Sequence, residues 1–177
     1  MIEVIDNVFD EKTVDDLYGH FRDFSSWGFT GSVADKNRWR KFQIVLDKED
    51  DIHSKLFLKA DGIFTGKLPG YKQSHVLRDA YASGYLFGTY HEIHKDYSNN
   101  ENGLTVMFYL NKVWQVSYGG ETVFLDPTES EIITSVIPKP GRALLFNGCV
   151  PHCAREVSRT CVELRMVATF KIVKKDG

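Results

Sequence analysis

A histidine and an aspartate two residues apart are the first side chains in this sequence that could bind a metal ion. His94 and Asp96 flank Lys95, and in an extended segment the side chains at positions i and i+2 point to the same side. The pair can therefore present an imidazole and a carboxylate to one ion. The pattern alone is weak evidence, because short matches of this kind arise by chance and the two side chains could simply pair with each other.

A second histidine strengthens the case for a metal site. His152 follows a strand that we expect at residues 142–146. Two histidines and one carboxylate can occupy one face of an octahedral metal and leave three positions open. Iron(II) centres that bind a chelating co-substrate and dioxygen need this arrangement. The same ligands also suit zinc, manganese or nickel, so they do not identify the metal.

The overall composition is that of a globular protein. The 177 residues are 42% hydrophobic and 26% charged, and a chain of this length buries roughly 70% of its unfolded surface. Lys and Arg number 22 against 24 Asp and Glu, a net charge of −2. We therefore expect no nucleic-acid partner, because such binding depends on clustered positive charge.

Targeting signals and disulfides are also not expected. The longest apolar run is about five residues, against the roughly 20 that a membrane helix needs. The first residues carry neither a basic segment nor an apolar core, so a cytoplasmic location without membrane association is the expectation. The three cysteines Cys149, Cys153 and Cys161 are an odd number, and we expect reduced thiols.

The hydrophobic pattern divides the chain into two parts of one expected domain, residues 1–177. In residues 1–72, apolar spacing predicts a helix capped by Asp10 and another over 51–64, with short strands near 2–9 and 41–46. In residues 73–177, β-branched and aromatic runs alternate with turn residues, which is typical of a sandwich or barrel. The clearest strands are residues 104–111, 121–125, 132–137, 142–146 and 162–172. We therefore predict an α+β fold in which N-terminal helices cover one sheet.

Alternation within two strands predicts a pocket for an anion. In residues 162–172 the even-numbered side chains are all apolar and suit the helices, so Arg165 and Thr169 must point into the sandwich. In residues 104–111 the same argument directs Tyr109 inward. A buried guanidinium needs an anionic partner. Together the two side chains suit a carboxylate.

Several segments in this order resemble the iron(II)- and 2-oxoglutarate-dependent dioxygenases of the prolyl 4-hydroxylase-like branch. The resemblance extends over residues 76–172, and that family has a double-stranded β-helix, also called a jelly roll or cupin-like fold. Its motifs here are His94-Lys95-Asp96, Thr105-Val106-Met107-Phe108-Tyr109-Leu110-Asn111 with Trp114, Gly119-Gly120-Glu121-Thr122-Val123-Phe124, Ser135-Val136-Ile137-Pro138-Lys139-Pro140-Gly141-Arg142, Leu144-Leu145-Phe146, His152 and Arg165.

The resemblance implies a role for each matching residue. His94, Asp96 and His152 correspond to the iron ligands, with no catalytic residue beyond them. Arg165 corresponds to the partner of the distal carboxylate of 2-oxoglutarate, and Tyr109 resembles the tyrosine that adds a hydrogen bond to it. Many members carry Ser or Thr two residues after the arginine, whereas this chain has Val167.

The activity implied by the resemblance is hydroxylation of an unactivated carbon, with Fe(II), 2-oxoglutarate and O2 required and ascorbate as a possible reductant. Succinate and CO2 would be released, and a prolyl residue in a polypeptide is the first expected substrate. A free amino acid or another small metabolite is the alternative substrate. A non-catalytic, cupin-like metal-binding domain is the alternative from another class. The sequence does not indicate the oligomeric state.

Other residues fit weaker hypotheses. Arg155 and Arg159 lie near His152 and are alternative anchors for the carboxylate. The three cysteines with His152 could be read as a zinc site, although their spacing matches no common zinc motif. His91 is expected to pack or to contact substrate rather than bind metal. Trp39 lies in a basic segment and is either a surface aromatic or part of a substrate-binding lid.

Overall fold

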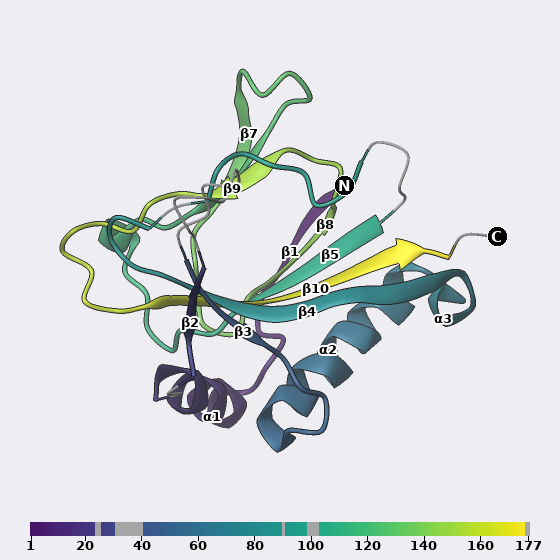
Figure 1. The fold of residues 1–177 in the computed structure, drawn as a ribbon, viewed down its shortest axis with the longest axis horizontal. Coiled ribbons are helices and arrows are strands. Elements are labelled where there is room, and N and C mark those ends of the chain that lie inside the picture. Colours follow the sequence, from purple (N-terminus) through teal and green to yellow (C-terminus); the bar gives the residue numbers. More distant parts are fainter. Residues whose placement is uncertain (24–25, 31–40, 90, 99–102, 176–177) are drawn as a thin grey trace.

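Two antiparallel sheets face each other in the computed structural model, and helices cover the outer side of the larger one (Figure 1). The structure describes residues 1–23, 26–30, 41–89, 91–98 and 103–175. The two sheets belong to a double-stranded β-helix, and with the helices they form the predicted α+β fold.

The major sheet has the strand order β1-β8-β5-β10-β4-β3-β2. Every pair of neighbours in it is antiparallel. β10 lies in the middle between β4 and β5, so both of its edges are hydrogen-bonded. The strands are β1 (Ile2–Ile5), β2 (Gly28–Thr30), β3 (Lys41–Val45), β4 (His75–Tyr85), β5 (Gly103–Tyr109), β8 (Ala143–Asn147) and β10 (Arg165–Lys174).

The minor sheet is smaller and has the order β7-β6-β9. Its strands are β6 (Thr122–Leu125), β7 (Ile132–Val136) and β9 (His152–Ala154), and a short 3-10 helix, η1 (Val116–Tyr118), precedes it. Apolar side chains from both sheets meet between them in one cluster, which includes Met107, Phe124, Phe146 and Val167. This cluster surrounds the interior to which the sequence assigned Arg165 and Tyr109.

The helices begin where acidic residues can cap them. Asp10 accepts a hydrogen bond from the backbone of Thr13 at 2.7 Å at the start of α1 (Glu11–Arg22). Asp50 accepts two backbone hydrogen bonds at the start of α2 (Asp51–Lys67). Such caps satisfy amide groups that have no partner within the helix. A single turn, α3 (Tyr71–Ser74), then leads into β4.

The outer face of β10 supplies the surface on which the helices pack. Its even-numbered side chains share one core cluster with residues of α1 and α2, as the alternation predicted. The ring of Phe170, for example, lies 5.0 Å from that of Phe57 on α2 in an edge-to-face arrangement. These side chains of β10 are Met166, Ala168, Phe170 and Ile172.

Some predicted boundaries differ from the structure. The strand expected at residues 2–9 ends at Ile5, and Asn7 adopts a left-handed conformation (φ 57°) that breaks it. The strand expected at 162–172 begins only at Arg165, while Val162 is 86% exposed. The two strands expected in residues 1–72 join the major sheet, since β1 pairs with β8 and β3 pairs with β4.

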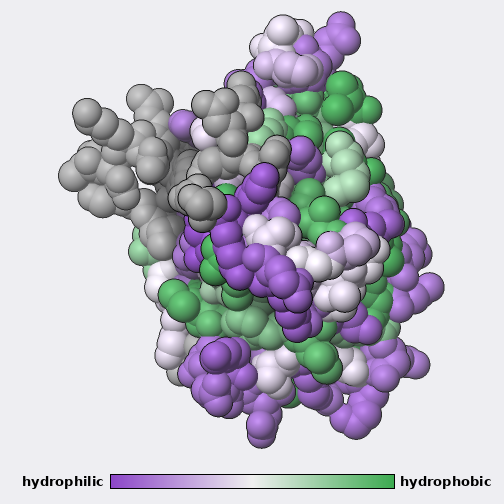
Figure 2. Space-filling view, turned by 90° about the vertical axis from the view of Figure 1, so that its right-hand side faces the viewer, coloured by the Kyte–Doolittle hydropathy of each residue, from purple (hydrophilic) through white to green (hydrophobic). Residues whose placement is uncertain are grey.

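Figure 2 shows hydrophilic and hydrophobic residues interspersed on one face of the molecule. Scattered apolar residues are normal on a protein surface. Among the described residues, no helix combines the length and the apolar character needed to cross a membrane.

Candidate active site

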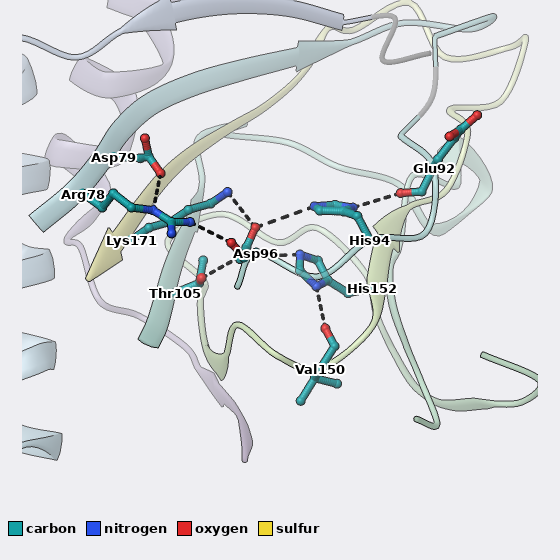
Figure 3. Close-up of polar contacts among 9 residues, drawn as sticks. All are labelled: Arg78, Asp79, Glu92, His94, Asp96, Thr105, Val150, His152 and Lys171. Carbon is teal, nitrogen blue, oxygen red and sulfur yellow. Dashed lines mark hydrogen bonds and ion pairs between the residues drawn. The ribbon is translucent and has the colours of Figure 1, made fainter. Parts of the chain in front are cut away.

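Backbone pairing brings the three predicted metal ligands together. His94 and His152 form an isolated antiparallel bridge, with N–H···O distances of 3.0 and 2.9 Å. The amide of Asp96 donates to the carbonyl of Gly148 at 2.7 Å, which fixes Asp96 beside the end of β8. The candidate ligand atoms of His94, Asp96 and His152 all lie within 4.8 Å of one another. Figure 3 shows the three side chains pointing toward a common centre.

Each imidazole is oriented by its second ring nitrogen. Nδ1 of His94 lies 2.9 Å from the carbonyl of Glu92, and Nδ1 of His152 lies 2.8 Å from that of Val150 (Figure 3). A carbonyl can only accept, so both Nδ1 atoms carry the proton and both Nε2 atoms offer a lone pair. Each Nε2 lies 3.7 Å from an oxygen of Asp96. Burial lowers the pKa of His152, and burial is also the main cause that lowers the pKa of His94 to about 4, so both rings are neutral at pH 7.

Three neighbouring side chains hold Asp96, two of them at its carboxylate. The hydroxyl of Thr105 donates to Oδ2 at 2.6 Å, and the ammonium of Lys171 lies 2.6 Å from Oδ1. Arg78 donates to the backbone carbonyl of Asp96 at 2.7 Å. Burial raises the pKa of Asp96, but the charge of Lys171 and the hydrogen bonds from Lys171 and Thr105 outweigh this effect, so the pKa is lowered. Asp96 is therefore ionised at neutral pH.

Arg165 lies in the same interior with one nitrogen uncommitted. Only 1% of the residue is exposed. Its Nε donates to the carbonyl of Gly120 at 2.5 Å, and its Nη2 donates to the hydroxyl of Thr122 at 2.9 Å. Nη1 is buried and has no hydrogen-bond partner among the described residues. A buried N–H of a cation without an acceptor is costly, so this nitrogen suits an incoming carboxylate.

Tyr109 borders Arg165, as the alternation of its strand predicted. Its hydroxyl lies 2.8 Å from that of Thr122 and 3.2 Å from the carbonyl of Val136. The guanidinium carbon of Arg165 lies 5.4 Å from the Tyr109 ring centroid and 5.3 Å from that of Tyr85. Two aromatic rings and two hydroxyl groups thus surround the guanidinium.

One cavity connects the candidate metal ligands with Arg165. Residues of both sheets line it, and its volume is about 40 Å³. The lining includes His94, Asp96, His152, Arg165, Thr122, Thr105, Tyr81, Ser83 and Tyr85.

Three contributors to this site were not singled out in the sequence. Thr122 carries the hydroxyl that approaches Arg165, where Val167 offers none. Alternation in β6 could have identified it, since Thr122 and Phe124 share one face. Lys171 lies on the predicted inner face of β10 together with Arg165 and Thr169. Thr105 shares the inner face of β5 with Tyr109, but its contact with Asp96 joins two segments that no strand pattern relates.

Several alternative residues do not reach the site. Arg155 and Arg159 are both exposed, and Arg159 lies over the ring of Phe87, so the structure does not support them as anchors. The three cysteines are free thiols, and within the described ranges none belongs to a candidate metal cluster. His91, by contrast, does line the cavity, and it is buried with its ring centroid 4.0 Å from that of His94. Trp39 lies outside the described residues.

A second group of residues has side chains that could bind a metal ion, but it has a different structural role. Candidate ligand atoms of His20, Asp50 and His53 also lie within 4.8 Å of one another. The amide of Asp47 donates to Nδ1 of His53, so the proton of that ring is on Nε2, 3.2 Å from Nε2 of His20. Asp50 caps α2, and His20 of α1 contacts His53 of α2. The group therefore joins the two helices through a histidine pair.

Three solved structures with a similar fold are prolyl hydroxylases. A prolyl-4-hydroxylase from Pseudomonas putida has 16% identity and a TM-score of 0.75, with 99% of this chain and 93% of that one covered. A prolyl hydroxylase from Trichoplax adhaerens, in complex with a hypoxia-inducible factor peptide fragment, has 18% identity and a TM-score of 0.71, with coverage of 99% and 83%. A viral collagen prolyl hydroxylase from Paramecium bursaria Chlorella virus-1, in complex with 2-oxoglutarate, has 18% identity and a TM-score of 0.67, with coverage of 97% and 95%.

The family follows from the sequence match rather than from these distant likenesses. A search of curated proteins found no match. The family model of the 2OG-Fe(II) oxygenase superfamily matches residues 80–172, more than half of the chain. Iron(II), 2-oxoglutarate and O2 are the cofactor and co-substrates of such enzymes, and both the two-histidine, one-carboxylate cluster and the uncommitted guanidinium nitrogen fit them. This chain belongs to the 2OG-Fe(II) oxygenase superfamily and is a 2-oxoglutarate-dependent dioxygenase.

Proposed function

We propose that His94, Asp96 and His152 bind the iron(II) and that Arg165, Tyr109 and Thr122 bind the distal carboxylate of 2-oxoglutarate. The observation that carries this proposal is one cavity with a facial set of neutral imidazoles and a carboxylate at one end and an uncommitted guanidinium nitrogen at the other. Two histidines and one carboxylate are the ligand set of non-haem iron(II) oxygenases.

The protein's own groups bind, orient and exclude water. The carbonyls of Glu92 and Val150 fix the two imidazoles, and Arg165 offers a charged hydrogen bond that selects a dicarboxylate. The apolar cluster around the cavity keeps bulk water away from the reacting centre. When bound, iron and 2-oxoglutarate supply the oxidation of a C–H bond by O2, coupled to decarboxylation of 2-oxoglutarate to succinate.

The substrate that we propose is a prolyl residue in a polypeptide. The solved structures with the similar fold include prolyl hydroxylases, one of them in complex with a peptide fragment. A surface pocket of about 630 Å³ adjoins the cavity and shares His91 and Ala154 with it. The pocket offers room for the peptide on either side of a prolyl residue that enters the cavity.

The charge of this surface pocket favours basic residues next to the target proline. Glu92, Glu121 and Glu156 line it together with one basic residue, Arg155, while Val123 and Leu125 supply apolar surface. An excess of negative charge attracts peptide segments that carry positive charge and helps to fix their register. We therefore expect peptides with lysine or arginine beside proline to react faster than peptides with glutamate there.

Two assays in sequence test the proposal. The protein is first incubated with iron(II), ascorbate and 2-oxoglutarate, and succinate is measured in the wild type and in His152→Ala. Proline-containing peptides with basic, neutral or acidic flanks are then added, and products are analysed for the gain of one oxygen. The matched control peptides carry alanine in place of proline.

The outcomes separate the hypotheses. Succinate from the wild type only, with oxygen added at proline, supports the full proposal. Succinate with oxygen added only to free amino acids or other metabolites would replace the polypeptide substrate by a small molecule. Equal, background succinate in the wild type and His152→Ala would indicate a non-catalytic, cupin-like metal-binding domain.

A further inference from the structure

A buried lysine contacts the carboxylate that the proposed metal site uses. The ammonium of Lys171 lies 2.6 Å from Oδ1 of Asp96, and the two side chains are 11% and 2% exposed. Figure 3 shows Lys171 reaching Asp96 from β10, on the side opposite the two histidines. The register of β10 against β4 shifts directly after Lys171. The ion pair thus forms where the central strand is irregular.

The surroundings of this ion pair are unusually positive. Lys41, of which 2% is exposed, has its ammonium 4.8 Å from the ring centroid of Tyr81, and that of Lys171 lies 5.3 Å from the same centroid. Burial and the charge of Lys171 lower the pKa of Lys41 to about 8. Asp96 is the one carboxylate among the described residues that line the cavity. A metal ion that binds Asp96 therefore enters a region that already contains buried ammonium groups.

We propose that Lys171 is a positioning residue that neutralises and orients Asp96 and opposes the binding of a divalent cation to it. The inference rests on the assignment of Asp96 as a metal ligand under the proposed function. Without metal, Lys171 compensates a buried carboxylate that would otherwise be expensive to bury. With metal, two cations share one carboxylate and repel each other. Lys171 thus limits metal affinity while Thr105, on the other oxygen, supplies orientation without charge.

The central experiment compares Lys171→Met with the wild type in two states. Thermal midpoints are measured in the metal-stripped protein and with excess Co(II), and the Co(II) dissociation constant is measured by titration. Without metal, Lys171→Met should lower the midpoint by roughly 6 °C or more, because it leaves a buried carboxylate unpaired. With Co(II) the deficit should shrink, because the ion replaces the lost charge. Co(II) should bind about tenfold or more tightly, a change of about 1.4 kcal/mol or more.

Three control variants separate charge from packing. Lys171→Arg retains the charge and should bind Co(II) as the wild type does. Thr105→Val removes a hydrogen bond from the same carboxylate without changing charge and should not tighten Co(II) binding. Lys174→Met removes a charge at the exposed end of the same strand and should change neither quantity.

Two results would overturn the inference. An equal midpoint loss with and without Co(II), together with an unchanged Co(II) dissociation constant, would show that Lys171 only packs. Tighter Co(II) binding by Lys171→Arg would show that charge is not the cause, and this variant serves if Lys171→Met does not fold. Asp96→Asn is measured in parallel. If it binds Co(II) like the wild type, the proposed metal assignment fails, which is distinct from a failure confined to Lys171.

Discussion

β10 presents Met166, Ala168 and Phe170 to the helices on one side and directs Arg165 and Lys171 to the opposite side, where Arg165 bonds Gly120 and Lys171 pairs with Asp96. The outer face is continuous apolar core, in which every side chain contributes burial. The inner face holds charges whose burial costs free energy unless they are paired. The comparison shows that the apolar outer face, packed against the helices, stabilises the fold. This stability offsets the free-energy cost of burying charged groups on the inner face.

Loss of a proposed metal ligand should have the largest effect on activity. His94→Ala or His152→Ala should reduce succinate formation to background, since the metal loses one of three protein ligands. Circular dichroism melting of the metal-stripped variants should remain cooperative, because the outer core is intact. The histidines are the better test, as Asp96→Ala also leaves the Lys171 ammonium unpaired. Retention of most succinate production in either variant would contradict the assignment.

Phe170→Ala tests the opposite face of the same strand. Phe170 is 1% exposed and packs edge-to-face against Phe57 and Phe108 at 5.0 and 5.9 Å. The cavity left by its removal should lower the free energy of unfolding by about 3 to 5 kcal/mol. Urea denaturation measures this, with Lys174→Ala at the exposed strand end as the control. The affinity of the folded protein for 2-oxoglutarate should not change, and a large change would mean that the two faces are coupled.

Arg165→Ala should act on 2-oxoglutarate binding. The variant leaves a carboxylate unpaired in a buried cavity, at a cost of about 2 to 5 kcal/mol, or roughly 30- to 4000-fold in affinity. Arg165→Lys should recover part of this loss, because the charge remains while the planar fork is lost. Anaerobic titration of the iron-loaded protein, followed by charge-transfer absorption, measures both. Unchanged affinity in Arg165→Ala would remove Arg165 from the proposed site.

The two hydroxyls beside Arg165 should matter less. Tyr109→Phe should cost about 1.5 to 3 kcal/mol of 2-oxoglutarate affinity, as expected for one hydrogen bond to a charged group. Thr122→Val should cost about 0.5 to 1.5 kcal/mol of 2-oxoglutarate affinity. The cost is smaller because the Thr122 hydroxyl already forms hydrogen bonds with Tyr109 and Arg165. The same titration measures both variants. A larger loss in either than in Arg165→Ala would reverse the proposed order of contributions.

The smallest effect is expected for an ion pair on the surface. Asp6 accepts from Nε and Nη2 of Arg142 at 2.7 and 3.1 Å, and the hydrogen bond from Arg142 is the main cause that lowers the pKa of Asp6 to about 2. This stabilisation is present above the unfolded-state pKa near 3.8 and is lost as pH falls toward 2. Asp6→Asn should therefore cost about 0.2 to 1 kcal/mol at pH 7.

Denaturation of this variant at pH 7, 4 and 2 checks the prediction. The difference in unfolding free energy between Asp6→Asn and the wild type should shrink over the acidic range. A difference that stays constant down to pH 2 would assign the effect to something other than ionisation of Asp6.

Short-range patterns predicted the faces of the strands. Alternation placed Arg165 and Tyr109 inside because their strand neighbours are apolar, and both side chains are buried in the structure. The Asp10 cap at the start of α1 also follows from sequence, because it involves neighbouring residues. The long strand β4 was not delimited. His152 follows β8, as expected, but it also begins β9, which was not predicted. That strand exists because β6 pairs with it, which no local pattern encodes.

The sequence by itself determined which side chains face the interior, because a period of two is a local property of a strand. Only the tertiary structure decided which interior side chains meet. Thr122 from the minor sheet reaches Arg165 from the major sheet, and Lys171 reaches Asp96. Such contacts depend on strand order and on how two sheets stack, and both follow from the free energy of the whole packed core rather than from any single segment.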